Sequence, residues 1–479
     1  MERSMKKKQV ILILILLASM RISAQLHLPP IINDHMVLQQ EAEVQLWGKS
    51  TPGENIKITP TWDGKEYVTK VDNQGDWKVC ILTPKAGGPF QIRIEVERES
   101  RVLNNVMLGE VWLCGGQSNM DISFKGLSNQ PIFNAIDELL DSNYPQLRLF
   151  RVKRAYSLTP MEECQGKWEV ASPESAVGFS AVGFLFGRLL HQREKMPVGV
   201  ITCAWGGSSV EAWMSRENVL RFVGVEIPNE TDNKRANETP TALFNAMLKP
   251  LTNYSIRGCL FYQGEANITE PDAYRERFPA MVKEWQKLWG KEFPFFYAQL
   301  APYSYKVINW ESEERQGARF REVQKECLVD IPNGEMIATS DIGASHTIHP
   351  GDKQTIAKRF YYLAANRCYG HKHFECIGPT YKTMQINDNR VAISFSHAPY
   401  GISSNGEEIV GFEVAGIDHR FYPAKARLKG RSIVEVCSDS VENPVAVRYC
   451  FTNYSKANLY NNFGLPAYPF RTDEWIDWK

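Results

Sequence analysis

The sequence lacks the features of several large protein classes. Basic and acidic residues are equal in number, 55 of each, so the chain has no charge excess of the kind that marks nucleic-acid binding. Its ten cysteines include no CxxC pair and no Cys/His cluster at zinc spacing, which argues against a structural zinc site. After Met20 no second long apolar run follows. These absences predict a globular chain without a nucleic-acid partner.

The first 24 residues have the pattern of a secretory signal peptide. Met1–Lys8 contains three consecutive lysines, Val10–Met20 is almost wholly apolar, and Ile22-Ser23-Ala24 supplies a small residue at a cleavage point. The apolar run is about half of the roughly 20 residues that a bilayer-spanning helix needs. We therefore predict cleavage before Gln25, export to the periplasm or extracellular space of a bacterium, and no membrane insertion after cleavage.

The stretch Gly109–Met120, GEVWLCGGQSNM, is an apolar run that ends in two glycines and a small polar cluster. Val111–Cys114 fits a buried strand, and Gly115-Gly116 permits a sharp reversal of the backbone. Ser118 would then lie at the carboxyl end of a strand, which is the edge of an open α/β sheet where ligands bind. A tight turn there can present the serine Oγ to a pocket, so Ser118 is a candidate nucleophile.

The chain after the leader divides into three predicted segments. Residues 25–105 alternate short apolar runs with turn signals, which favours a β-sandwich-like domain. In residues 106–370 strand patterns alternate with helical ones, such as a helix capped by Ser180 and another over Asp272–Leu288, and this order is typical of a parallel α/β sheet. Strand patterns return over residues 371–479, which either form a sandwich of their own or join the first one.

Four strand ends of the predicted α/β domain carry the parts of a serine esterase. Ser118 is the candidate nucleophile and His349, within Asp341–Pro350, the candidate general base, because a free hydroxyl is a poor nucleophile at neutral pH. Attack on an ester carbonyl produces an oxyanion that needs fixed donors. The candidate donors are the Ser118 N–H, the Gly207 N–H and the side-chain amide of Asn267.

These motifs resemble those of a known superfamily. GQSN, WGG, QGEAN and the IHP segment are similar to blocks one, two, three and five of the SGNH hydrolases, specifically the sialate O-acetylesterases, and DHMVLQ, GFEVAG and LPAYPFRTDEW extend the resemblance over nearly the whole mature chain. The resemblance implies a flavodoxin-like three-layer α/β/α catalytic domain flanked by the β-rich segments. It also implies removal of acetyl groups from sialic acids or sialoglycans without a cofactor or metal. The candidate substrate-binding residues in these motifs are Gln117, Gln263 and Glu265.

One position departs from the SGNH pattern. The pattern places an aspartate three residues before the catalytic histidine, where this chain has His346. A histidine cannot replace a carboxylate in stabilising an imidazolium. Asp341, which ends a predicted strand, is the favoured third member, and Asp352 and Glu265 are alternatives. A fourth possibility is a Ser-His dyad whose histidine is oriented by a backbone carbonyl.

Two other functions compete with the leading prediction of an exported sialate O-acetylesterase. An acetylesterase that acts on plant polysaccharide such as acetylated xylan needs the same chemistry, and motifs around the nucleophile do not separate the two substrates. The chain could instead be a glycan-binding protein with an inactive esterase domain. The intact set of serine, glycine, asparagine and histidine argues against this last function.

Overall fold

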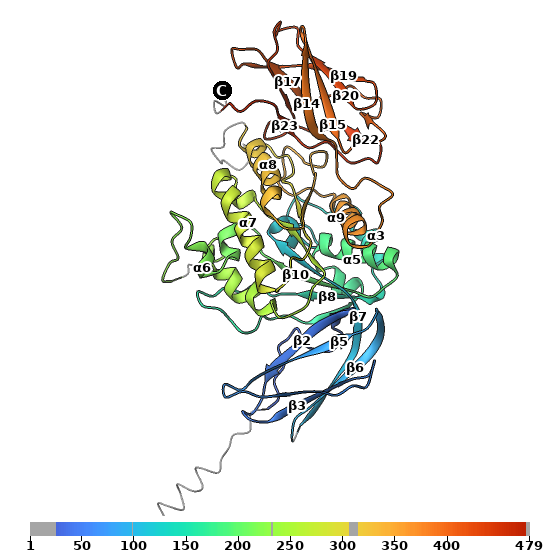
Figure 1. The fold of residues 1–479 in the computed structure, drawn as a ribbon, viewed down its shortest axis with the longest axis vertical. Helices are drawn as coiled ribbons and strands as arrows, with labels where there is room; N and C mark the ends of the chain where they lie inside the picture. Colours follow the sequence, from blue (N-terminus) through green and yellow to red (C-terminus); the bar gives the residue numbers. More distant parts are fainter. Residues whose placement is uncertain (1–24, 98, 231–232, 306–314, 476–479) are drawn as a thin grey trace, which may run out of the picture.

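The computed structural model describes residues 25–97, 99–230, 233–305 and 315–475. The predicted signal peptide, residues 1–24, lies outside the described residues. Figure 1 shows an elongated molecule with a β-rich region at each end and an α/β region between them. Within the described ranges no helix has the length and apolar character needed to cross a membrane.

The amino-terminal region consists of two β layers. The alternation in β2 is regular: Val44 and Leu46 are buried, whereas Gln45, Trp47 and Lys49 lie on the other face. One layer pairs β2 with β5 in antiparallel register, and the other joins β3 to β4 and β6. The bounds are β1 Val37–Gln39, β2 Ala42–Lys49, β3 Asn55–Pro60, β4 Tyr67–Lys70, β5 Asp76–Thr83 and β6 Gly87–Glu95.

The long strand β7, Ser100–Gly116, connects this region to the central sheet. Its first half pairs antiparallel with β6, and its second half pairs in parallel with β10, Val198–Ala204, and β11, Gly258–Tyr262. One hydrophobic core runs through both regions. The predicted boundary between residues 105 and 106 therefore falls inside a continuous strand, and the division into 25–105, 106–370 and 371–479 stays a prediction.

The central sheet has the strand order β13-β12-β11-β7-β10-β8-β9 and is parallel except for β9. The apolar runs Val198–Cys203, Ile256–Tyr262, Phe295–Leu300 and Met336–Thr339 predict four strands, which correspond to β10 to β13. The sequence patterns did not predict β8 and β9. In β8 the arginines Arg148 and Arg151 interrupt the apolar run, although Arg148 is buried. The remaining bounds are β8 Tyr144–Arg151, β9 Trp168–Ala171, β12 Phe295–Ala298 and β13 Gly334–Ile337.

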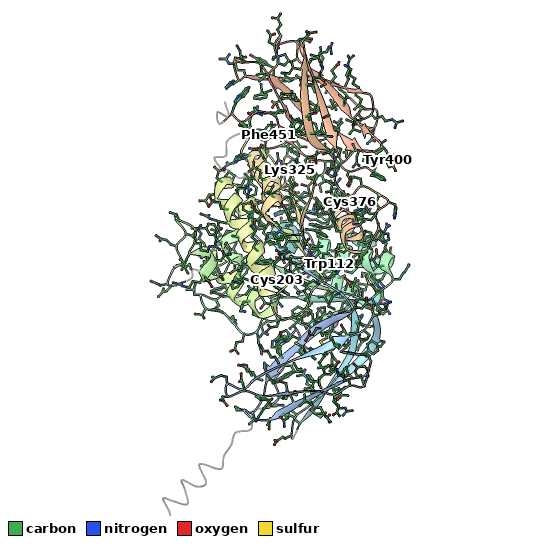
Figure 2. All side chains as sticks on the ribbon, viewed as in Figure 1. Trp112, Cys203, Lys325, Cys376, Tyr400 and Phe451 are labelled. Carbon is green, nitrogen blue, oxygen red and sulfur yellow. The ribbon has the colours of Figure 1, made fainter. Side chains whose placement is uncertain are left out.

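Helices cover both faces of the central sheet. On one face α5 and α9 pack against each other, and α7 and α8 lie on the other (Figure 1). Helix α5 begins after Ser180, whose Oγ accepts a hydrogen bond from Gly183 N at 3.0 Å. Trp112, labelled in Figure 2, fills the centre of the region and packs against Phe186 and Phe296. The helix bounds are α2 Ser118–Asp121, α3 Ala135–Leu140, α4 Pro173–Ala176, α5 Ala181–Glu194, α6 Arg216–Val219, α7 Pro271–Leu288, α8 Gln316–Glu326 and α9 Lys353–Cys368.

The carboxyl-terminal region is built from antiparallel strands around its own core. One sheet has the order β14-β15-β20-β19 and a second has the order β18-β17-β21-β23, while β16 pairs with β22. Most of its buried apolar residues form a cluster of their own, although Cys376 and Tyr468 belong to the core of the other two regions. In the described part of the chain none of its strands pairs with an amino-terminal strand, so this segment does not join them. The bounds are β14 Thr380–Asn387, β15 Arg390–Ser396, β16 Ile402–Ser403, β17 Phe412–Ala415, β18 Phe421–Pro423, β19 Lys425–Lys429, β20 Ile433–Cys437, β21 Ala446–Tyr449, β22 Tyr460–Asn461 and β23 Phe470–Arg471.

Candidate active site

Ser118 and His349 meet at the carboxyl end of β7. Gly116, the last residue of β7, has φ +129°, and a Cβ at this position would lie 2.2 Å from the carbonyl oxygen of Tyr262. Only glycine therefore allows the turn that places Ser118 at the start of α2. The Ser118 Oγ lies 2.8 Å from His349 Nε2, although the two residues are 231 positions apart. This is the distance that a nucleophile and its general base require.

A cavity of about 900 Å³ opens beside this pair at the carboxyl ends of the parallel strands. Ser118, Gly207, Asn267 and His349 all line it, so the structure brings four of the predicted catalytic residues to one place. Ligand sites of open α/β sheets lie at this edge. In the described part of the chain no group of three or more His, Cys, Asp or Glu side chains could hold a metal ion.

The loop after β10 brings backbone donors next to the nucleophile. A Cβ on Gly206 would lie 3.4 Å from the Ser118 Cβ, and Gly207 has φ +71°. The N–H groups of Ser118 and Gly207 have no hydrogen-bond acceptor among the described residues. Two uncommitted amides beside a nucleophile can bind the oxygen that becomes negative when a carbonyl is attacked.

Asn267 is held in one orientation by its neighbours. Its Oδ1 accepts hydrogen bonds from Val210 N at 2.9 Å and from Gln263 Nε2 at 2.8 Å. Its Nδ2 donates to the carboxylate of Glu211, at 3.0 Å from Oε2, and Glu211 pairs in turn with Arg277 at 2.7 Å. The nitrogen also lies 3.3 Å from Glu211 Oε1, and one hydrogen can serve both oxygens of that carboxylate. An amide nitrogen carries two hydrogens, so the other one can be donated to a ligand in the cavity.

His349 is oriented by an amide and not by a carboxylate. Its Nδ1 lies 2.5 Å from Oε1 of Gln130, which also accepts a hydrogen bond from Thr347 Oγ1 at 2.8 Å. When Nε2 accepts the Ser118 hydroxyl proton, Nδ1 carries the other ring proton and donates it to Gln130. Gln130 can therefore fix the tautomer of His349, but it adds no negative charge to stabilise the imidazolium.

The structure corrects the prediction that Asp341 orients His349. Both carboxylate oxygens of Asp341 accept hydrogen bonds from Arg359, at 2.8 and 2.7 Å, so this ion pair joins the end of β13 to α9. Asp352 caps α9, where its Oδ1 accepts from Thr355 N at 2.9 Å. His346 is exposed. Arginine is a bidentate partner for a carboxylate, which explains why Asp341 turns toward α9.

Asn119 links the loops that carry the catalytic groups. Its Nδ2 donates to Glu265 Oε1 at 2.6 Å and to the Ile348 carbonyl at 3.1 Å, and its Oδ1 accepts from Lys353 Nζ at 2.7 Å. Burial raises the pKa of Glu265 and lowers the pKa of Lys353 to about 7. Burial, and then the Lys353 charge, lower the pKa of His349 to about 4. His349 is therefore neutral at neutral pH and can accept a proton.

The three predicted substrate-binding residues, Gln117, Gln263 and Glu265, are all buried and hydrogen-bonded within the protein. Gln117 Oε1 accepts from the backbone N–H groups of Gly264 and Ala266, at 3.1 and 3.3 Å. These contacts are those of residues that support the loops around the cavity. A role in substrate binding stays a prediction for each of them.

Sequence reasoning missed Gln130, Asn119, Glu211 and Lys353. Asn119 directly follows the predicted nucleophile, and Glu211 lies just after the glycine pair, so their positions in the motifs were a usable signal. Gln130 offered no signal, because it lies between α2 and α3 in a segment without helical or strand periodicity. Its approach to His349 depends on the fold alone.

A serine and histidine pair beside uncommitted amides, in a cavity of a mixed α/β fold, is the arrangement of a carboxylic ester hydrolase. Comparison with known proteins gives the same class. A family model described as "Carbohydrate esterase, sialic acid-specific acetylesterase" matches residues 108–357. The chain belongs to this family.

Individual relatives cover nearly the whole chain. The sialate O-acetylesterase of Homo sapiens is 30% identical over 92% of this chain and 91% of its own length, and that of Mus musculus is 28% identical over 92% and 93%. Among solved structures, a carbohydrate acetylesterase from Xanthomonas citri superposes with a TM-score of 0.85 and 32% identity, covering 94% of this chain and 100% of that one. These relatives support the assignment of the chain as a carboxylic ester hydrolase.

Proposed function

We propose that this protein is an exported sialate O-acetylesterase with an SGNH-type catalytic domain, in which Ser118 is the nucleophile and His349 the general base. The observation that supports this mechanism most directly is the 2.8 Å approach of Ser118 Oγ to His349 Nε2 at the cavity. The family to which the chain belongs indicates the bond that is cleaved, which is the ester bond between an acetyl group and a sialic acid.

In the proposed reaction His349 takes the hydroxyl proton as Ser118 Oγ attacks the carbonyl carbon of the acetyl ester. The carbonyl oxygen becomes negative and is held by the N–H groups of Ser118 and Gly207 and by the Asn267 amide. The intermediate collapses, and the sugar oxygen leaves with the proton from His349. Water then gives a proton to His349 and attacks the acetyl-enzyme, which releases acetate and returns the proton to Ser118.

The support of His349 by Gln130 suits the departure of a sugar alkoxide. A carboxylate partner would stabilise the imidazolium, whereas Gln130 leaves it without a counter-charge. Burial and the Lys353 charge lower the pKa of His349 to about 4, so its imidazolium is a stronger acid than that of an ordinary histidine. It therefore passes its proton readily to the strongly basic leaving oxygen.

The charge of the cavity favours a second candidate substrate, a neutral acetylated polysaccharide such as acetylated xylan. Glutamates outnumber arginines in the cavity lining, and both arginines already pair with glutamates: Arg277 with Glu211 and Arg235 with Glu238. An acidic lining repels an anion and accepts a neutral sugar. The lining glutamates are Glu211, Glu226, Glu230, Glu238, Glu265 and Glu270, and the arginines are Arg235 and Arg277.

The deciding experiment compares acetate release from O-acetylated sialic acid and from acetylated xylan, with a chromogenic acetyl ester as the measure of intrinsic competence. A higher kcat/KM on the sialic acid supports the proposed function, and a higher value on xylan supports the neutral candidate. Ser118→Ala is the matched blank for every substrate. Failure to cleave any acetyl ester would contradict the mechanism itself.

Export is tested separately. Amino-terminal sequencing of the secreted protein shows whether the chain is cleaved before Gln25.

A further inference from the structure

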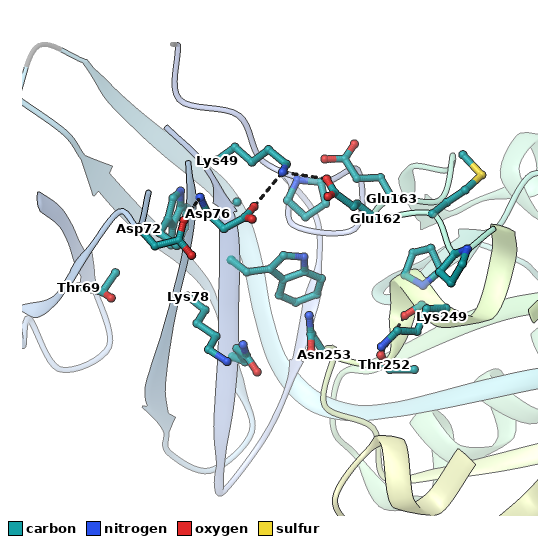
Figure 3. Close-up of a pocket in the computed structure, with 18 of the residues that line it drawn as sticks. Lys49, Thr69, Asp72, Asp76, Lys78, Glu162, Glu163, Lys249, Thr252 and Asn253 are labelled. Atoms are coloured by element: carbon teal, nitrogen blue, oxygen red, sulfur yellow. Dashed lines mark hydrogen bonds and ion pairs between the residues drawn. The ribbon is translucent and has the colours of Figure 1, made fainter. Parts of the chain in front are cut away.

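A second cavity lies between the outer face of β2 and β5 and the segment that precedes β11. Its volume is about 700 Å³, and a neighbouring cavity of about 540 Å³ shares Gln45, Thr252 and Asn253 with it. Because the two cavities share a wall, we treat them as one elongated groove, called here the β2 groove. In Figure 3 Asp72 and Lys78 lie on the side of the amino-terminal strands, and Lys249 lies across from them on the side of the central region.

The β2 groove is separate from the catalytic cavity. Thr252 and Asn253 precede β11, whereas Asn267 follows it, so the two sites lie at opposite ends of this strand. The five residues of β11 span about 17 Å at roughly 3.3 Å per residue. A ligand in the β2 groove can therefore be bound while the catalytic cavity is occupied.

Trp47 provides a flat apolar surface within the groove. It lies on the outer face of β2, is only partly buried, and is opposite Lys78 of β5 in the antiparallel register. Its ring packs edge-to-face against Tyr254, with centroids 6.5 Å apart and an angle of 72° between the rings. The neighbour limits the motion of the indole, so a ligand that packs on Trp47 meets an ordered surface.

Polar groups without a partner surround this ring. The side chains of Gln45, Lys78 and Asn253 make no hydrogen bond or ion pair with the described part of the chain. Over its two cavities the groove is lined by six lysines and five carboxylates, so its charges nearly balance. Lys49 illustrates this balance, since it pairs with Asp76 at 2.9 Å and with Glu162 at 2.8 Å (Figure 3).

We propose that the β2 groove is a binding site for a neutral glycan chain. A pyranose ring has an apolar C–H face and a rim of hydroxyls, which match the Trp47 ring and the free donors and acceptors of Gln45, Lys78 and Asn253. The nearly balanced charges favour neither an anion nor a cation strongly. The elongated shape fits several linked sugars, so the groove retains a polymer while another part of that polymer, or a second chain, occupies the catalytic cavity.

The test measures binding of xylohexaose, a neutral unacetylated oligosaccharide, to the full mature chain by isothermal titration calorimetry. The Ser118→Ala background removes turnover. Trp47→Ala is expected to weaken binding by about tenfold, and Gln45→Ala and Asn253→Ala by smaller factors. The matched control is Trp62→Ala, because Trp62 is also a partly buried tryptophan of this region but packs on Phe90 outside the groove. It should leave the affinity unchanged.

Each outcome decides the proposal. Absence of xylohexaose binding at millimolar concentration overturns it, as does equal binding by Trp47→Ala and its parent, which would place the sugar in the catalytic cavity. Binding confined to an acidic hexamer of sialic acid contradicts the neutral class. If Trp47→Ala does not fold, Gln45→Ala and Asn253→Ala decide, and unchanged affinity in both overturns the proposal. Cleavage of a chromogenic acetyl ester by the groove variants, made with Ser118 intact, is measured separately, so failure here is distinct from failure of the serine mechanism.

Discussion

The two sides of the active site are held by different kinds of partner. On the oxyanion side Asn267 is fixed by Glu211, which is itself paired with Arg277. On the base side His349 is fixed by the neutral amide of Gln130. The difference shows that charged groups are used on one side of the site only. The Asn267 amide, which faces a developing negative charge, is held by an ion pair, whereas the His349 ring, which becomes positive, has no counter-charge.

The largest expected effect comes from removing the hydroxyl of Ser118, on which both the oxyanion donors and the general base act. Ser118→Ala should lower kcat by roughly 10⁴-fold or more, since neither the donors nor the base can act without a nucleophile. Thermal melting should change little, because a small hydroxyl contributes little to the core. Acetate release and calorimetry measure the two quantities. Retained turnover would rule out the serine mechanism, and mapping a serine-directed phosphonate adduct to Ser118 is the companion observation.

The oxyanion side is tested next by Asn267→Ala. Loss of one oxyanion donor should lower kcat by roughly 10²–10³, with KM little changed. Glu211→Gln keeps a hydrogen-bonding side chain but removes the charge, so it should cost less than Asn267→Ala. The matched control is Glu238→Gln, which alters an exposed glutamate of the same cavity. A rise in KM alone would make Asn267 a substrate-binding residue.

The base side is tested by two changes at Gln130. Gln130→Ala should lower kcat by roughly ten- to a hundredfold. Proton transfer by a positioned base contributes more than this to the rate, and a His349 that is no longer oriented loses only part of that contribution. In the parent enzyme kcat/KM should persist above pH 4 and fall below it, because His349, with its pKa lowered to about 4, must be neutral to accept a proton.

Gln130→Glu distinguishes orientation from charge. A carboxylate would stabilise the imidazolium and raise the pKa of His349, so the acidic limb of the kcat/KM profile should move to higher pH. Rate measurements from pH 3 to 9 on a chromogenic ester, whose cleavage does not depend on glycan binding, record this shift. An unmoved limb in Gln130→Glu, together with an unchanged kcat in Gln130→Ala, would mean that Gln130 does not act on His349.

The smallest catalytic effect is expected at Asp341. Asp341→Asn should lower kcat by less than tenfold, about 1.4 kcal/mol, because Asp341 faces Arg359 and not His349. It should instead lower the free energy of unfolding by about 1–3 kcal/mol, since the largely buried guanidinium of Arg359 loses its charged partner. Urea unfolding beside acetate release separates the two effects, and His346→Ala is the exposed control. A loss of kcat larger than that of Gln130→Ala would restore Asp341 as the orienting group.

Most of the candidate catalytic residues could be predicted from the sequence because the ends of strands can be recognised there. Ser118, Gly207 and Asn267 each follow an apolar run, and the carboxyl ends of parallel strands meet at one edge of a sheet. Helices α5 and α7 were likewise predictable, from the cap at Ser180 and from a clear apolar stripe.

The support of His349 could not be predicted, because it depends on contacts between distant segments. Gln130 lies 219 residues from His349, in a segment without periodicity. Asp341 was expected to end a strand, but β13 ends at Ile337 and Asp341 lies in the turn that follows. The sequence also does not tell that Arg359, 18 residues later, is the partner of this carboxylate. The ends of strands determine which backbone positions come together, and they can be predicted from the sequence. Which polar side chains then pair with one another depends on tertiary contacts, which the sequence patterns do not show.

The unbroken course of β7 has a consequence for how this protein can be altered. Its 17 residues are shared between two regions, and one hydrophobic core encloses both. A shortened chain that starts at residue 106 would carry half a strand and leave apolar side chains uncovered, so we expect it to aggregate. The amino-terminal strands are therefore not a detachable module to be swapped among esterases, and any chimaera must inherit them together with the nucleophile that β7 delivers.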